Sequence, residues 1–539
     1  MAGNKINIQD IIDEVSAKER FSFLDGDRNS VLERARNCAK LTIPSILPDS
    51  GHTETTDLDT PYQAVGSRLV NNLSAKLLLS LLPPNNSFFR LLISEDIKNQ
   101  IEAQDAANNQ QQQQPGFLQQ TPTNTGMLSQ VEAQLVKVEQ QVLKQIEREA
   151  LRVPTFEAIK SLIVTGNSMC YKTDVGLKTY KLSNYVILRD FKGQPIEIIL
   201  KETTTKDTLT PELLNQLGED VTDRNTIDIY TRAVFKNDVW YEYQTVEEVL
   251  VEGSETTYSN DKNFPYIPLR WTGVNGENYG RGLVEQYLGD FRSLEALYQM
   301  LLEASAVQAR VIFGKRPGGQ VDLDALNDAE NGACIQGDLE QDITTLRVDK
   351  NSDLQIPMNM VQDLTRRLEQ AFLVASSVAR DSERTTATEI RYMAADLEEA
   401  LGGVYSLLSL EYQRPLANIL LAQSKINLKQ LGLDVVIVTG IDALGRNNDL
   451  ERLRQFNMFL KELGSPELVL QRLNIDNYIS MIGNALGLET NSLVKSTAQI
   501  QNEQAAQQQQ QLMMQGASGA VDAGVQQLMP QQQQQQPQA

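Results

Sequence analysis

The sequence predicts an α+β protein that is mostly helical, and three observations support this fold class. Apolar residues recur at spacings of three and four through much of the 539-residue chain, which is the period of a helix with a buried face. From Ser168 the pattern changes to the alternation that is typical of strands, first in residues 170–202 and again in residues 226–253. These strand-like segments follow one another without a regular βαβ alternation, which indicates an α+β unit.

Size and charge bound the organisation and the partners of the chain. With 41% apolar residues the chain can bury several cores, and domains of about 100 to 200 residues predict three or four structural units. The formal charge is −21, from 70 acidic and 49 basic residues. Because tight binding of nucleic acid depends on counterion release by basic side chains, we expect any DNA partner to be touched only lightly.

Most enzyme chemistry is excluded by what the sequence lacks. His52 is the only histidine and lies in a polar segment that reads as a loop, so a Ser-His-Asp system or a His-rich metal site is not expected. Neither G-x-x-x-x-G-K-[ST] nor G-x-G-x-x-G is present, and the glycine clusters at 276–282 and 314–319 lack the phosphate-binding pattern. We therefore predict no catalytic residue, no metal site and no cofactor.

Cysteine usage and hydropathy suggest a compartment. Cys38, Cys170 and Cys334 lie far apart without metal-ligand spacing, which predicts free, buried thiols in a reducing environment. The N-terminus carries no apolar signal region, and no window approaches 18 uninterrupted apolar residues. We expect neither secretion by a signal peptide nor a membrane partner.

The first 166 residues read as helices around one polar insertion. Residues 9–40 fit two helices, the second capped by Asn29 or Ser30, and a third helix lies between Pro61 and the Pro83-Pro84 pair with apolar residues on several faces. A low-complexity, exposed insertion covers residues 99–126. An amphipathic helix follows, with Val131, Leu135, Val138, Val142 and Ile146 on one face, and then a helix that ends at Gly166.

The middle of the chain predicts strands and then a helical hairpin. Residues 170–202 contain three strand-like runs, and the second group turns at Lys236-Asn237-Asp238. A helix of roughly 28 residues follows, then a compact, turn-rich insert at 314–350 and a returning helix. Two antiparallel helices with a small insert at their tip offer a natural docking point.

Residues 382–416 begin as a charged loop and continue as a long helix to about Ser424. Gly402 and Gly403 should weaken this helix, and Pro415 should bend it. A core helix kinked to follow a curved surface is one explanation. A strand from residue 434, a helix and a last helical group from Pro466 to Lys495 follow, and residues 501–539 form a glutamine-rich tail that we expect to be disordered.

Five blocks of the sequence resemble a known family in order and separation. They are CAKLTIPSILP (38–48), TPYQAVGSRLVNNLSAKLLLSLLPP (60–84), FPYIPLRW (264–271), YGRGLVEQYLGDFRSLEAL (279–297) and TATEIRYMAADLEEALGGVYSLLSLEYQRPL (386–416). The chain resembles the portal, or head-to-tail connector, proteins of short-tailed, podovirus-type bacteriophages from about residue 20 to about residue 490. The glutamine-rich insert and tail depart from this resemblance.

The resemblance implies a portal-type subunit with wing, stem, clip and crown, which assembles into a ring around a central channel. The implied segments are 1–283, first part of the wing with a disordered insert at about 105–125; 284–312, first stem helix; 313–355, clip; 356–375, second stem helix; 376–386, channel loop; 387–463, second part of the wing with the kinked spine helix; 464–500, crown; and 501–539, disordered tail.

The resemblance also implies partners and site residues. The expected assembly is a ring of twelve copies at one capsid vertex of the virion, built in the host cytoplasm, through which double-stranded DNA is packaged and later ejected. Expected partners are sequence-nonspecific, transiently bound DNA, the terminase, tail adaptor or nozzle proteins, major capsid and scaffolding proteins, and internal core proteins. The implied site residues are Arg380, Asp381, Ser382, Glu383 and Arg384 on the channel loop, Gly402, Gly403 and Pro415 at the spine-helix kink, and Lys315 and Arg316 at the clip.

Three alternatives remain open from the residues. Arg380 and Arg384 could pair with Asp381, Glu383 or a neighbouring subunit instead of DNA, and Lys315 and Arg316 could be ordinary solvated surface. The chain could also be a ring-forming head-tail adaptor or scaffold protein without a DNA channel. A nuclease or packaging ATPase is disfavoured by the missing P-loop and the single histidine.

Overall fold

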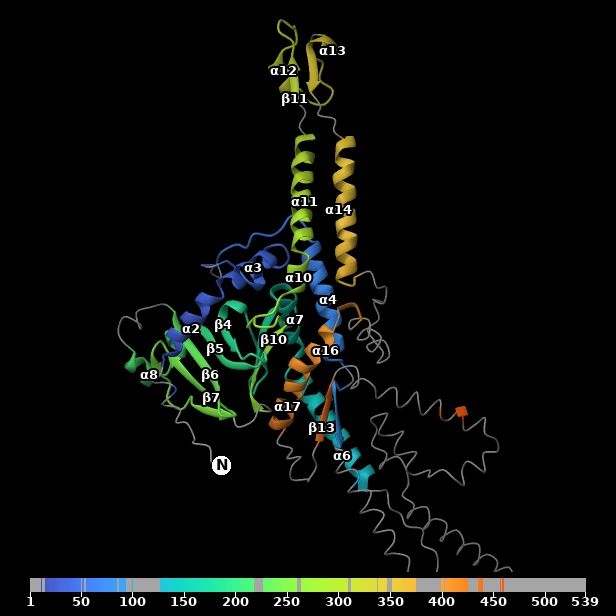
Figure 1. Cartoon of the computed structure of the whole chain (residues 1–539). Helices are drawn as coiled ribbons and strands as arrows, with labels where there is room; N and C mark the ends of the chain where they lie inside the picture. The colour runs from blue at the N-terminus through green and yellow to red at the C-terminus, as the bar shows by residue number, and fades with distance from the viewer. Residues whose placement is uncertain are drawn as a thin grey trace, which may run out of the picture. The chain divides into compact units, whose positions relative to one another are not determined.

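In a computed structural model, drawn in Figure 1, the chain divides into two compact units. The first unit comprises residues 1–90, 140–427 and 437–444, and the second comprises 91–139, 428–436 and 445–539. The structure describes residues 11, 15–49, 51–52, 55–84, 87–93, 99, 127–217, 226–258, 263–308, 312–336, 338–346, 351–374, 399–401, 403–424, 435–439, 456 and 458–459. The predicted glutamine-rich insert, channel loop, crown and tail lie outside these residues.

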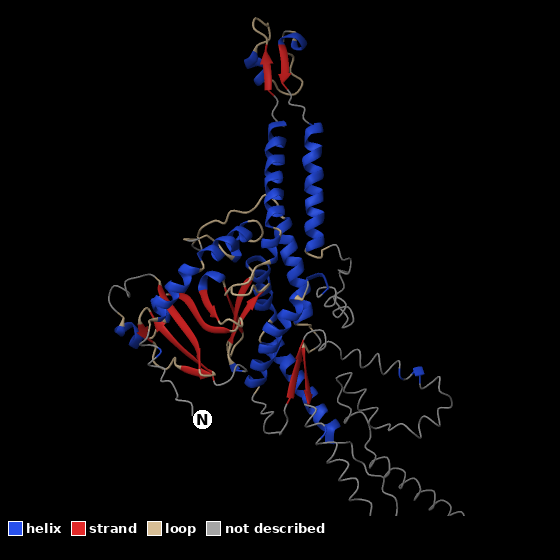
Figure 2. Ribbon diagram, in the orientation of Figure 1, coloured by secondary structure: helices blue, strands red, loops and turns tan. Residues whose placement is uncertain are grey.

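Helices and strands alternate in blocks, which confirms the mostly helical α+β class (Figure 2). The α-helices are α2 (Ala17–Asp27), α3 (Asn29–Lys40), α4 (Val65–Leu81), α6 (Met127–Arg148), α7 (Arg152–Thr165), α8 (Pro211–Gln216), α10 (Leu283–Gln286), α11 (Leu288–Gln308), α12 (Leu323–Asn327), α13 (Leu339–Asp342), α14 (Asn351–Ala371), α16 (Val404–Leu408) and α17 (Arg414–Gln423). The strands are β1 (Phe89–Ile93), β2 (Asn167–Lys172), β3 (Leu177–Tyr180), β4 (Tyr185–Arg189), β5 (Pro195–Thr204), β6 (Ile227–Lys236), β7 (Val239–Val246), β8 (Val249–Leu250), β9 (Thr256–Tyr258), β10 (Tyr266–Arg270), β11 (Ile312–Lys315), β12 (Ile343–Leu346) and β13 (Val435–Thr439).

The N-terminal helices match the prediction except at their caps. The hydroxyl of Ser16 accepts the Glu19 backbone N–H and caps α2. Asn29 or Ser30 was predicted to cap the second helix, but its N-cap is Arg28, without a side-chain cap, and Asn29 is already helical. The prediction failed because α3 continues directly from α2, so the Arg28 guanidinium is drawn to the carbonyls of a distant turn instead.

The predicted strand region contains four strands instead of three, and they belong to two sheets. β2 and β3 pair with β10 in the order β10-β2-β3, while β4 and β5 begin the larger sheet with the path β4-β5-β6-β7-β8, from which β9 pairs with β7. The turn between β6 and β7 lies at Asn237 and Asp238, whose φ angles are 53° and 62°. Two successive left-handed residues make the tight hairpin that was predicted there.

One face of the larger sheet carries the core of this region. α2 lies on this sheet and packs Phe21 and Leu24 against Val186, Ile199 and other apolar residues of β4 to β7 (Figure 1). A smaller cluster places α8 on the same sheet, with Leu213 and Leu217 against Ile227 and Val246. Burial of alternate strand residues under these helices fixes the register.

Gly166 shows what the predicted glycine-rich cluster at 276–282 does. Gly166 ends α7 with a φ of 78°, as predicted, and an added Cβ would lie 2.4 Å from the Gly282 nitrogen. The side chain of Asn167 joins the same contact through two hydrogen bonds to the backbone of Gly280, of 2.7 and 2.9 Å. These glycines therefore allow close backbone packing between α7 and the segment before α10.

α4 and α6 show the predicted packing. Exposed residues of α4 such as Arg68, Asn71 and Ala75 form one narrow face, and the remaining faces contact α7, α14 and the segment around α16. On α6 the predicted apolar stripe is buried from Leu135 to Ile146, whereas Val131 is only half-buried. α4 therefore packs on more sides than a peripheral helix does, whereas the described part of α6 buries one face.

The helical hairpin differs from the prediction at its bounds. The helix expected at 284–312 is broken at Tyr287 into α10 and the 21-residue α11. The returning helix α14 begins at Asn351, earlier than the expected residue 356, and tolerates Pro357 inside it. α11 and α14 contact each other along their length and run antiparallel (Figure 1).

The cysteine and histidine predictions have mixed outcomes. All three cysteines are free and Cys38 and Cys170 are buried, but Cys334 is exposed, so the prediction of a buried thiol was wrong there. Cys334 lies in the turn-rich segment between α12 and α13, which is too small to bury it. His52 lies in a loop, as predicted, and is half-buried.

Candidate functional site

The antiparallel helices α11 and α14 form a two-helix layer, which we call the helix pair. At its lower half the pair is covered: Phe291 and Leu294 of α11 are buried, as are Leu364 and Leu368 of α14. Arg68 of α4 forms an ion pair of 2.7 Å with Glu369 of α14. These contacts fix this half of the pair on the α4 side of the fold.

The other half of the helix pair exposes apolar side chains on its outer faces. We call this set the apolar band. Each of its side chains is between 42% and 67% exposed. The band consists of Met300, Leu302 and Val307 on α11 and Ile356, Met358 and Met360 on α14. Because α11 and α14 are antiparallel, the C-terminal half of one lies beside the N-terminal half of the other, so the six residues fall in one zone.

The segment between the two helices, residues 312–346, holds the predicted docking residues. β11 and β12 pair antiparallel, with Lys315 opposite Ile343. The Arg316 N–H donates to the Asp342 carbonyl at 2.9 Å, and the Gln320 N–H donates to the Asp342 carboxylate at 2.7 Å. The side chains of Lys315 and Arg316 are exposed at this ordered turn.

Acidic residues outnumber Lys315 and Arg316 in the segment 312–346. Seven carboxylates lie in the same segment, at Asp322, Asp324, Asp328, Glu330, Asp338, Glu340 and Asp342. A partner of this segment therefore faces mainly negative charge, with one basic corner at residues 315–316.

The predicted kink region is more elaborate than a proline bend. Gly403 has a φ of 89° and caps α16, so the glycine interrupts the helix instead of only weakening it. Between α16 and α17 the chain forms a π-helical segment, Ser409–Gln413, which we call the π segment, and Pro415 follows in the first turn of α17. The helix continues to Gln423, close to the predicted Ser424.

Three partners hold the π segment. The Glu411 carboxylate accepts the Arg270 guanidinium at 2.8 Å and the Arg270 backbone N–H at 3.2 Å. The hydroxyls of Tyr412 and Thr155 lie 2.5 Å apart, and the Gln413 amide donates to the Leu81 carbonyl at 2.8 Å. No periodicity of the sequence signals a π segment, which is why the sequence analysis missed it.

Arg380, Asp381, Ser382, Glu383, Arg384 and Gly402 lie outside the residues that the structure describes. The role of the five loop residues at a DNA channel and the role of Gly402 at the spine-helix kink therefore remain predictions.

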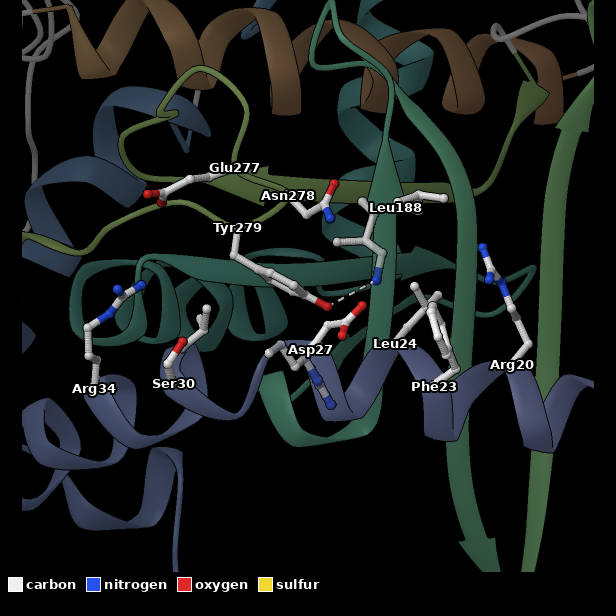
Figure 3. Close-up of a pocket in the computed structure, with 13 residues that line it drawn as sticks. Arg20, Phe23, Leu24, Asp27, Ser30, Arg34, Leu188, Glu277, Asn278 and Tyr279 are labelled. Carbon is white, nitrogen blue, oxygen red and sulfur yellow. Dashed lines mark hydrogen bonds between the residues drawn. The ribbon is translucent and has the colours of Figure 1, made fainter.

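The sequence analysis also missed a pocket of about 360 Å³ at the outer edge of β4 (Figure 3). Its lining comes from α2, α3, β4 and the loop before α10. Side chains of Arg34, Ser30, Glu277 and Asn278 surround it. β4 is the edge strand of the larger sheet, so one side of its backbone has no neighbouring strand.

Side chains occupy that free edge in place of a strand. The Tyr279 hydroxyl accepts the Ile187 N–H at 3.2 Å, as drawn in Figure 3, and the Asn278 side-chain oxygen accepts the Arg189 N–H at 2.9 Å. Arg28 donates to the Tyr185 carbonyl at 2.5 Å. Residues 185, 187 and 189 are the alternate positions that point away from β5, so the edge is covered at three successive outward positions.

Features of an enzyme centre do not stand out in the described residues. There, no group of three or more His, Cys, Asp or Glu side chains is placed to hold a metal ion. Burial raises the pKa of Cys38 and of Cys170 to about 12, so neither thiol is a nucleophile near neutral pH. Within the described part of the chain, no helix combines the length and apolar character needed to cross a bilayer.

Comparison with known proteins identifies the family. The portal protein of Enterobacteria phage T3 is 34% identical over 508 residues, covering 90% of each chain, and that of Escherichia phage T7 is 34% identical over 513 residues, covering 91% of this chain and 90% of the relative. Among solved structures, a chain described as "Neck of empty GTA particle computed with C6 symmetry" aligns over 72% of this chain and 86% of its own length, with a TM-score of 0.33 and 12% identity. The family model "Bacteriophage head to tail connecting protein" matches residues 14–494. The chain therefore belongs to the bacteriophage head-to-tail connecting protein family.

Proposed function

We propose that this chain is the subunit of a portal ring of twelve copies at one capsid vertex, through which double-stranded DNA enters the head and later leaves it. Family membership and two relatives named portal protein support this role. Head-to-tail connecting proteins are structural parts of the phage particle, and this function needs no catalytic residue, metal or cofactor.

The apolar band is the observation that carries the proposal of a ring. A two-helix layer with six large apolar side chains on its outer faces leaves apolar surface in water in a single copy. Contact with the helix pair of a neighbouring copy buries that surface, at about 25 cal/mol for each Å². If each copy meets a neighbour on both flanks, the contacts close into a ring.

The proposed parts of the subunit follow the segments expected from the sequence. The helix pair is the stem, residues 313–355 are the clip, 1–283 and 387–463 are the wing, and 464–500 are the crown. The channel loop at 376–386 follows α14 directly in the chain, which supports its placement beside the stem. We propose that Arg380 and Arg384 contact the DNA backbone there, beside Asp381, Ser382 and Glu383.

The charge of the chain suits DNA that must slide. At −21 per copy, twelve copies carry a formal charge on the order of −250. An acidic body repels phosphates and so opposes tight binding, while a few basic side chains offer transient contacts without reading sequence.

The proposed partners fall into two groups, those that dock on the clip and those that surround the ring in the head. The terminase docks on the clip during packaging, and tail adaptor or nozzle proteins dock there afterwards, with Lys315 and Arg316 in the contact. Major capsid and scaffolding proteins surround the ring at its vertex, and internal core proteins meet it inside the head. The ring assembles in the host cytoplasm and remains in the virion.

Electron microscopy of the purified full-length chain tests the ring. Wild-type protein should give rings with an open centre wide enough for a DNA duplex. The double variant Leu302→Ser, Ile356→Ser should give mostly single subunits, because both changes place a hydroxyl in the apolar band. Phe191→Ser is the matched control, since Phe191 is 85% exposed on the turn between β4 and β5 and should leave rings intact.

Two results would contradict the proposal. Ring particles without a central opening would favour an adaptor or scaffold protein over a portal. Rings of normal abundance in the double variant would show that the apolar band is not the contact between copies.

A further inference from the structure

The last turn of α4 contacts both ends of the stretch that joins α14 to α16. The Lys76 ammonium donates to the Leu373 carbonyl at 2.5 Å, just after α14. The Tyr405 hydroxyl donates to the Ser80 carbonyl at 3.0 Å, in the first turn of α16. Lys76 and Ser80 are four residues apart and so lie on one face of α4, where the Ser80 hydroxyl also donates to the Lys76 carbonyl at 3.0 Å.

The first of these ends has a backbone conformation that needs support. The Val374 N–H donates to Glu369 and the Leu373 N–H to Gln370, at 2.8 and 3.1 Å, which is the hydrogen-bond pattern of a Schellman motif. The left-handed position of this motif usually holds glycine, but here it is Leu373, with a φ of 59°. A leucine in this conformation is strained, and such strain persists only where surrounding contacts hold it. Lys76 supplies a positive charge at the C-terminal end of α14, where it is favourable.

The second end is set by the π segment. Tyr405 and Gln413 donate to Ser80 and Leu81, two successive carbonyls at the C-terminus of α4 that have no partner within the helix. Eight residues of regular α-helix would place these side chains about 80° apart around the axis, since each residue turns about 100°. A π turn takes up one additional residue, so the eight residues rotate only about as far as seven would in an α-helix. The angle between the Tyr405 and Gln413 side chains is then about 20°. The π segment thus brings both donors to the same face.

We propose that the last turn of α4, residues 76–81, is a clamp that fixes the two ends of residues 374–404 relative to each other. Lys76 and Tyr405 are its positioning residues. The functional meaning rests on the proposed portal ring, because residues 374–404 include the loop proposed to face DNA. The clamp would hold the Leu373 end and the Tyr405 end at one separation in every copy of the ring.

Hydrogen exchange of the full-length protein tests the clamp. Lys76→Met keeps the aliphatic stem and removes the ammonium, and Tyr405→Phe removes only the hydroxyl. Each variant loses one hydrogen bond, so amide exchange should speed up about tenfold beside the lost bond. For Lys76→Met these are the amides of Leu373 and Val374, and for Tyr405→Phe they are the amides around residue 405. A clamp also predicts an effect on the opposite end of the α4 turn, so Tyr405→Phe should speed exchange at the Leu373 and Val374 amides. In the double variant the increase in exchange rate should be smaller than the product of the two single increases.

Two exposed residues provide matched controls. Lys40→Met and Tyr62→Phe make the same chemical changes at side chains that are 54% exposed and 57% exposed, and neither should alter exchange at residues 373–374. If each clamp variant changes exchange at its own end alone, the two contacts are independent and the clamp is refuted.

DNA content of assembled particles separates the clamp from the proposed function. Particles built with Lys76→Met or Tyr405→Phe should contain normal rings and less DNA than wild-type particles. If exchange at the two ends is coupled but the variant particles contain a normal amount of DNA, the clamp exists and does not act on DNA. That result would overturn its functional meaning. Absence of rings in the wild type would refute the proposed function, while the exchange experiment would still decide the clamp.

Discussion

At the scale of single residues, Glu242 is a carboxyl group buried where two sheets meet. It lies on β7 and is 5% exposed, and its Oε2 is buried with no hydrogen-bond partner. The hydroxyls of Tyr258 on β9 and Tyr266 on β10 bond the carboxyl group, and Tyr171 on β2 stacks on Tyr266 with centroids 4.7 Å apart. Burial outweighs these hydrogen bonds and raises the pKa of Glu242 above its usual 4.5.

Replacement of Glu242 by Gln should change how stability depends on pH. Because the folded state prefers the protonated carboxyl, the contribution of Glu242 is fully present below about pH 4.5 and is lost as pH rises through the raised pKa. Glu242→Gln mimics the protonated form, so its Tm should equal that of the wild type near pH 4 and exceed it at pH 7. Thermal unfolding over a pH series measures this, with Glu255→Gln, an exposed change just before β9, as the control.

Residue-level prediction from sequence succeeded where the determinant is local. The hairpin turn at Asn237 and Asp238 and the helix end at Gly166 follow from the conformations these residues adopt, whatever surrounds them. Glu242 could not be found in this way, because its hydroxyl partners come from two other strands and its burial is decided by the meeting of two sheets. The failed cap at Asn29 has the same cause, a distant turn that binds Arg28.

At the scale of elements, the covered edge of β4 predicts a specific failure. The double variant Asn278→Ala, Tyr279→Phe removes two acceptors from outward N–H groups of β4. Each loss should cost about 1 kcal/mol in the free energy of unfolding. The exposed edge should also favour pairing with other copies, seen as increased light scattering at high protein concentration.

A comparable change on a helix isolates the edge effect. Asn71→Ala with Tyr62→Phe alters the same residue types on or beside α4, away from any strand edge, and should leave light scattering unchanged. Equal scattering from the two double variants would show that Asn278 and Tyr279 do not protect the edge.

Periodicity predicted most elements, and it failed where packing overrides it. The stripes of α4, α6 and α14 are long enough to identify those helices, although their ends shift by several residues. The break at Tyr287 and the π segment have no signal in the pattern, because each serves contacts with elements far away in the sequence. Pro415 lies in the first turn of α17, directly after the π segment, and Gly403 interrupts the helix before α16.

At the scale of the whole molecule, the family could be predicted from the sequence and the apolar band could not. The five matching blocks were enough to predict the family, and the comparisons confirm it over residues 14–494. The apolar band could not be derived from periodicity, because Met300 and Ile356 differ from core residues only in which neighbours cover them.

Loss of the two arginines in the proposed channel loop should affect DNA and not assembly. Arg380→Ala with Arg384→Ala removes the proposed transient phosphate contacts, so rings should form normally while DNA content per particle falls. Counting rings by microscopy and measuring packaged DNA checks both parts. Lys192→Ala with Lys206→Ala removes the same charge from exposed positions on either side of β5 and should leave DNA content normal. Loss of rings in the arginine variant would instead place these residues in a contact between subunits.

The unequal exposure of the three cysteines makes the protein ready for site-specific labelling. Cys38 and Cys170 are buried thiols whose pKa is raised to about 12, and they should resist a maleimide at neutral pH. Cys334 is exposed in the segment between α11 and α14. A fluorophore added to the unmodified protein would therefore attach there. In the proposed ring of twelve copies it would mark the proposed clip with twelve equivalent dyes, without any engineered residue.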